Sequence, residues 1–161
     1  MDILGLIAPL RVEGILAAII CGFIIGLERQ LAGKPTGIRT CILICLGTYA
    51  FVTVSQLIQG SNIDPGRIVG QIITGIGFIG GGVILAREGV VVGITSAAVI
   101  WILAGVGILI GYGKIAASIL LSIITVSILF GVNILEKTFI ALRKGVHEKL
   151  ATHKKKKDDD A

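Results

Sequence analysis

Charged residues are missing from four long stretches of this sequence, and this spacing limits the folds that the chain can adopt. The uncharged stretches are 24, 19, 25 and 21 residues long and cover residues 40–63, 68–86, 89–113 and 115–135. A helix needs about 20 mostly apolar residues to cross the hydrocarbon core of a bilayer. A shorter stretch, residues 14–27, has 14 residues and is marginal alone. The chain is therefore predicted to be an all-α, polytopic membrane helix bundle of about five transmembrane helices.

The composition supports a membrane protein. Of the 161 residues, 54% are hydrophobic and 16% are charged, and the mean hydropathy is +0.95. A soluble domain carries about 25% charged residues. The length fits one transmembrane domain, which we expect over residues 1–135. Residues 136–161 are expected to form a basic cytoplasmic tail with an amphipathic helix and a disordered end.

The distribution of Lys and Arg predicts the orientation. With five spans, twelve of the fifteen Lys and Arg lie on the side of the C-terminus, whereas Arg11, Arg67 and Lys114 lie on the other side. Basic residues favour the cytoplasmic side, which places the C-terminus in the cytoplasm and the N-terminus outside. The expected partner of the basic tail is a bilayer with anionic headgroups, not a nucleic acid.

Small residues recur along the predicted spans. In lipid such residues let helix backbones approach closely. The candidate helix-packing residues are Gly14, Ala18, Gly22 and Gly26 in the first span and Gly75, Gly77 and Gly81 in the third. They predict a tight bundle, but one of these ridges could equally be a homodimer face, and the sequence does not separate the two uses.

Polar residues in or beside the spans are the candidates for function, because charged groups at membrane depth are costly. They are Glu28, Arg29, Arg39, Thr40, Asp64, Arg67, Gln71, Thr95 and Ser96. Glu28 could pair with Arg39 across the first hairpin, or these charges could be interfacial anchors. Asp64 before Pro65 is typical of a helix N-cap. Thr95 and Ser96 could bond helix carbonyls or form a polar patch with Gln71. Trp101, in the middle of a span, is expected to pack between helices.

Several kinds of chemistry find no support in the sequence. The segment Gly75-Ile76-Gly77-Phe78-Ile79-Gly80 fits a dinucleotide fingerprint but lacks the strand and the acidic residue that this motif needs. The acids that border the spans divide between the two membrane faces, so no metal site is predicted. With no nucleophile–base pair either, we expect neither an enzyme nor a cofactor.

The order and spacing of several segments resemble the membrane domain of the MgtC/SapB family. They are residues 26–30, 37–40, 64–68, 75–84 and 93–98, followed by Trp101. The family usually has Thr-Thr-Ala-Ala at Thr95-Ser96-Ala97-Ala98, and Leu at Ile79. Longer members carry a C-terminal domain of the ACT type, which we do not expect in this chain.

The resemblance implies a multi-pass protein of the bacterial inner membrane that is linked to growth at low magnesium and, in pathogens, to survival inside host cells. It favours a regulatory role through contacts with another membrane complex, such as ATP synthase. The alternative is a transporter or channel for Mg²⁺ or another small solute, lined by Glu28, Arg39, Arg67, Gln71, Thr95 and Ser96. We favour regulation, because no paired carboxylates for a cation are present.

Overall fold

A computed structural model of the chain describes residues 8–57, 64–87 and 90–138. This part contains five helices and a short hairpin. The helices are α2 (Val12–Leu31), α3 (Ile38–Ser55), α4 (Pro65–Val83), α5 (Ile94–Gly111) and α6 (Ile115–Thr138), and the hairpin joins β1 (Leu85–Arg87) to β2 (Val90–Val92). The helical fold class is confirmed. The amphipathic helix expected after residue 138 lies outside the described residues.

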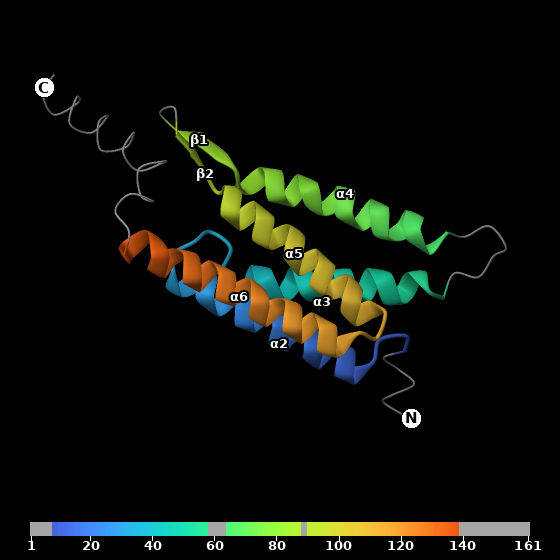
Figure 1. The fold of residues 1–161 in the computed structure, drawn as a ribbon. Helices are drawn as coiled ribbons and strands as arrows, with labels where there is room; N and C mark the ends of the chain where they lie inside the picture. Colours follow the sequence, from blue (N-terminus) through green and yellow to red (C-terminus); the bar gives the residue numbers. More distant parts are fainter. Residues whose placement is uncertain (1–7, 58–63, 88–89, 139–161) are drawn as a thin grey trace, which may run out of the picture.

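Helices α2, α3, α5 and α6 pack against one another, and α4 lies outside them against α5 (Figure 1). By length and composition α3, α4, α5 and α6 could each cross a membrane. Helix α2 is 20 residues long and includes Glu13, Glu28 and Arg29. Helix α2 nevertheless packs in the four-helix core, where its residues Cys21 and Ile25 are fully buried.

Helices α2 and α3 approach closely because glycines of α2 face the α3 backbone. A Cβ atom on Gly22 would lie 2.6 Å from the Cα atom of Ile42, and one on Gly26 would lie 2.6 Å from the Cα atom of Ile38. Gly14 faces the ring of Tyr49. With Ala18 fully buried between them, these residues form one buried face of α2 against α3.

Small sulfur and hydroxyl groups link the core helices. Cys21, Cys41 and Cys45 are free and fully buried, in agreement with the packing role that small apolar residues have in such bundles. The Sγ atom of Cys21 lies 3.8 Å from the Oγ atom of Ser118 on α6, and the Sγ atom of Cys45 lies 3.6 Å from the carbonyl oxygen of Leu103 on α5. Small side chains of α2 and α3 thus contact α6 and α5 inside the core.

The connection from α4 to α5 is an antiparallel hairpin in which Leu85 pairs with Val92 and Arg87 with Val90. The sequence analysis did not identify this hairpin, because three-residue strands are too short to show a pattern. The N-cap predicted at Asp64 is confirmed, since its Oδ1 atom accepts a hydrogen bond of 2.8 Å from the amide of Gly66.

Gly93 joins the hairpin to α5 in the left-handed region, with φ +94°. A Cβ atom there would meet the carbonyl oxygen of Val83 at the end of α4. We expect Gly93→Ala to lower the free energy of unfolding by about 1–3 kcal/mol, because backbone strain and a backbone clash add. Thermal unfolding in detergent would measure the loss. The same substitution at Gly105, where a Cβ atom meets no described atom within 4 Å, should leave the midpoint nearly unchanged.

The outer helix α4 and its neighbour α5 bear on two expectations from the sequence. Of the two uses left open for Gly75, Gly77 and Gly81, packing inside the bundle is not found, because a Cβ atom on any of them would meet no described atom within 4 Å. The reason is helix phase: α4 contacts α5 through the face of Ile76 and Gly80, and those three glycines point elsewhere. Trp101 was expected to pack between helices, yet it is 55% exposed on α5.

Candidate functional site

Arg29 is a buried charged residue near the end of α2. The residue is only 2% exposed, and its Nε atom contacts the Oε2 atom of Glu28. Its Nη2 atom donates a 2.7 Å hydrogen bond to the Oε1 atom of the same carboxylate. A bidentate pair is the strongest form of this interaction. It neutralises a charge that would be costly to bury alone.

The pairing of Glu28 with Arg39 that the sequence suggested is wrong. Glu28 contacts Arg29, whereas Arg39 is exposed at the start of α3. The physical reason is burial: the guanidinium of Arg29 has little access to water and needs the carboxylate, while that of Arg39 can be hydrated.

The loop between α2 and α3 is hydrogen-bonded to the end of α2 beside this pair. The amide of Lys34 donates to the carbonyl oxygen of Arg29 at 2.9 Å, and the amide of Ile38 donates to Oε1 of Gln30 at 3.3 Å. The Nη1 atom of Arg29 and the Oγ1 atom of Thr36 are buried and have no hydrogen-bond partner in the described part of the chain. Buried polar atoms usually have one. We call Glu28, Arg29 and Thr36 the α2–α3 cluster.

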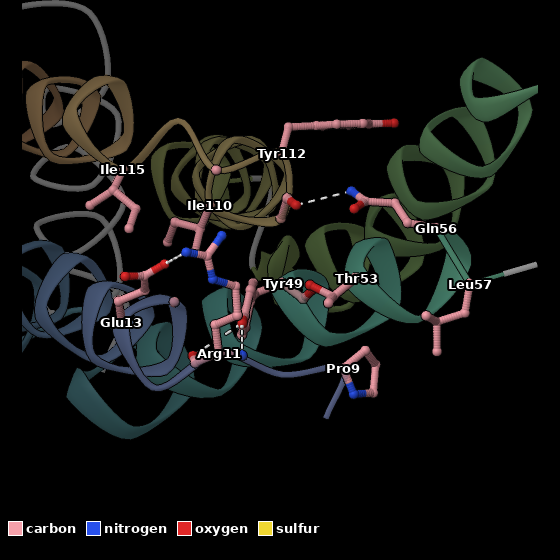
Figure 2. A pocket seen from close by; sticks show the side chains of 13 residues that line it. Pro9, Arg11, Glu13, Tyr49, Thr53, Gln56, Leu57, Ile110, Tyr112 and Ile115 are labelled. Carbon is pink, nitrogen blue, oxygen red and sulfur yellow. Dashed lines mark hydrogen bonds and ion pairs between the residues drawn. The ribbon is translucent and has the colours of Figure 1, made fainter. Parts of the chain in front are cut away.

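A pocket of about 500 Å³ lies at the opposite end of the four-helix core. Figure 2 shows it where α2 and α6 begin and where α3 and α5 end. Its lining residues are Pro9, Arg11, Glu13, Gly14, Tyr49, Thr53, Gln56, Leu57, Ile110, Gly111, Tyr112, Gly113 and Ile115. A volume of this size is within the range of small-molecule sites.

Hydrogen bonds fix the inner wall of the pocket. The hydroxyl of Tyr49 accepts a 2.7 Å bond from the amide of Arg11 and donates at 3.2 Å to the carbonyl oxygen of the same residue. The Nε2 atom of Gln56 donates to the carbonyl oxygen of Gly111 at 3.0 Å. By contrast, the side chains of Arg11 and Glu13 form an ion pair at the mouth and are 74% and 54% exposed. The pocket thus has a fixed wall and a charged mouth.

The helix ends at the pocket are not equivalent electrostatically. Arg11 holds the N-cap position of α2 but makes no side-chain cap, so the first amides of this helix keep their hydrogen-bonding capacity. At the end of α5, the carbonyl oxygens of Leu109 and Ile110 each accept a 2.8 Å bond from the turn that follows, and Gln56 occupies that of Gly111. The free donors of α2 and the guanidinium of Arg11 favour an anionic group here.

A third feature is the exposed face of α4. Only 6% of its membrane-length segment is buried, compared with 39% in α3 and 44% in α5. Around the helix, Gly70, Thr74, Gly77 and Gly81 follow one another at intervals of four, three and four residues, on a side that does not meet α5. Beside this row Phe78 is 86% exposed. We call these five residues the outer face of α4.

The structure brings together only two of the predicted functional residues, Glu28 and Arg29. Arg39, Thr40, Asp64, Arg67, Gln71 and Thr95 are exposed, and Ser96 is buried. The polar patch suggested for Gln71, Thr95 and Ser96 does not form, because α4 and α5 are antiparallel. Gly80 faces Ala97, and Gln71 lies nine residues earlier, or about 13 Å along the axis.

The prediction from sequence missed the pocket, although a signal was present. Tyr49, Thr53 and Gln56 are polar and are spaced by four and three residues, so they share one face of the second span. Arg11 and Glu13 stand just before the first predicted span, residues 14–27. Thr36, in a loop, carried no signal of burial.

Comparison with known proteins gives one consistent result. The sequence model of the MgtC family matches residues 15–138. "Putative magnesium transporter YhiD" of Escherichia coli (strain K12) is 42% identical over 84% of this chain and 65% of its own length. "Protein MgtC" of Brucella abortus (strain 2308) is 38% identical over 81% of this chain and 56% of its own length. "Protein MgtC" of Salmonella typhimurium is 42% identical over 68% of this chain and 47% of its own length. No solved structure matches.

Proposed function

This chain belongs to the MgtC family, and we propose that it is a regulator in magnesium-linked physiology that acts by binding another membrane protein. We place it in the bacterial inner membrane and assign it no enzymatic step. The chain spans about half to two thirds of the length of the relatives it matches, so what is proposed concerns the membrane domain that they share.

The observation that carries the proposal is the outer face of α4. Helices in lipid associate through close backbone contact at small residues, since apolar area alone gives no drive between them. Gly22 and Gly26 of α2 already use this mode against α3. Gly70, Gly77 and Gly81 offer the same surface with no described neighbour within 4 Å. A helix of another membrane protein is the occupant that fits this surface.

The position of the polar residues supports regulation rather than conduction. A pathway through the chain would need its polar groups to converge inside the bundle. Instead Arg39, Arg67, Gln71 and Thr95 are exposed, on three different helices. Between the two polar ends of the core lie fully buried apolar side chains, namely those of Cys21, Ile25, Cys45 and Leu103.

The test is to fill the outer face of α4 with a bulky side chain. We expect Gly77→Leu to lose most of its ability to restore growth at low magnesium in a strain that lacks its own family member. The matched control is Gly131→Leu on α6, because a Cβ atom on either glycine meets no described atom within 4 Å. Wild-type growth of the Gly77 variant, at equal protein levels, would contradict the proposal.

The second candidate function is transport of Mg²⁺ or another small solute. It is favoured by one observation: the α2–α3 cluster and the pocket lie at opposite ends of the same four helices. Vesicles with a trapped magnesium dye separate the two functions. Regulation predicts no flux above that of protein-free vesicles. Flux that is lost in Arg29→Met would replace the regulatory proposal.

A further inference from the structure

The pocket at the start of α2 has properties that the regulatory proposal does not use. It is lined by residues of four helices, lies where the spans end and therefore at the depth of the lipid headgroups, and has a charged pair at its mouth. We propose that it binds a phosphodiester that carries a primary ammonium group, which is the chemistry of a zwitterionic phospholipid headgroup.

The anionic half of the ligand is assigned to Arg11 and the start of α2. The guanidinium of Arg11 is largely exposed, so it can give up part of its ion pair with Glu13 and contact a phosphate. This movement does not unbury any core side chain. The adjacent amides of α2 have no side-chain cap. A guanidinium together with free helix amides is a common phosphate-binding arrangement.

The cationic half is assigned to Glu13. When a phosphate takes up Arg11, the carboxylate loses its partner, and an ammonium group on the same ligand can replace it. In the complex the phosphate thus pairs with Arg11 and the ammonium with Glu13, so no charge of the protein or of the ligand is left unpaired.

The size and surroundings of the pocket agree with a headgroup. Its volume of about 500 Å³ is large enough for a phosphoethanolamine unit. Leu57, which is 60% exposed, and Pro9 both line the pocket and lie on the same side of it in Figure 2. These apolar residues suit the glycerol and the first methylenes of the acyl chains.

The experiment is a binding titration of the full chain, purified in detergent, with two short-chain lipids of equal acyl length. We expect dihexanoyl phosphatidylethanolamine to bind about tenfold more tightly than dihexanoyl phosphatidylglycerol, since only the first has an ammonium group for Glu13. Arg11→Gln should weaken both lipids about tenfold. Glu13→Gln should remove the preference while leaving phosphatidylglycerol bound at least as tightly as before.

Lys114→Gln is the matched control, because Lys114 is an exposed cation next to the pocket residue Gly113 but does not line the pocket. Equal affinity for the two lipids in the unaltered chain, or an Arg11 variant that binds as the Lys114 variant does, would overturn the proposal. Glycerophosphoethanolamine identifies the source of the ligand. If it binds as tightly as the lipid, the ligand is a soluble phosphodiester; weaker binding identifies the lipid.

Discussion

Replacing Gly22 or Gly26 by alanine is expected to lower the free energy of unfolding by about 1–3 kcal/mol at each site. The added methyl group would lie 2.6 Å from the Cα atom of Ile42 or Ile38, and a backbone atom cannot rotate away as a side chain can. The two helices would have to separate, and the contacts along this buried face of α2 would weaken together. We therefore expect the double variant to be damaged more than either single variant.

Unfolding by SDS in mixed micelles, followed by circular dichroism, would measure this loss. Gly47→Ala on α3 is the control, because a Cβ atom there meets no described atom within 4 Å and alanine favours the helix. It should unfold as the unaltered chain does, or at slightly higher SDS. If Gly22→Ala behaved like Gly47→Ala, helices α2 and α3 would be farther apart than described.

The helices α3 to α6 could be predicted from the sequence because membrane span is a local property. The uncharged stretches 40–63, 68–86, 89–113 and 115–135 each contain or nearly cover one helix. Their length is set by the bilayer and does not depend on what packs beside them. The N-cap at Asp64 was predictable for the same reason, since the cap and the amide it accepts from are two residues apart.

The direction in which a small residue points could not be predicted. Gly22 and Gly77 both lie in glycine-rich spans, yet the first meets the backbone of α3 and the second meets no described atom. The difference depends on which neighbour each helix obtains in three dimensions. Within one copy, the predicted close packing is therefore found for Gly14, Gly22 and Gly26 of α2 and not for Gly75, Gly77 and Gly81, whose alternative use as a homodimer face stays a prediction.

The candidate sites were only partly predictable, because burial decides which charges pair. Glu28 and Arg29 were both singled out, but their mutual contact was not, since Arg39 was an equally plausible partner from spacing. The pocket requires residues of four helices, and Arg11 meets Tyr49 across 38 positions of the chain. Contacts of this kind follow from helix arrangement and leave little trace in local sequence.

The largest single-site effect is expected at Glu28. Glu28→Ala should lower the free energy of unfolding by about 3–5 kcal/mol, because it leaves the guanidinium of Arg29 buried without its counter-charge. The Nη1 atom of Arg29 already lacks a partner among the described residues, so the remaining structure has little with which to replace the carboxylate.

A double-mutant cycle measures the interaction energy between Glu28 and Arg29 apart from the effect of losing either side chain. Glu28→Leu combined with Arg29→Met removes both charges, and it should be less damaging than Glu28→Leu alone, since no unpaired charge stays buried. Arg39→Ala is the control for the alternative pairing. Because Arg39 is exposed, its loss should change the free energy of unfolding by no more than about 0.5 kcal/mol. A large effect of Arg39→Ala, together with a small effect of Arg29→Met, would show that Glu28 pairs across the hairpin after all.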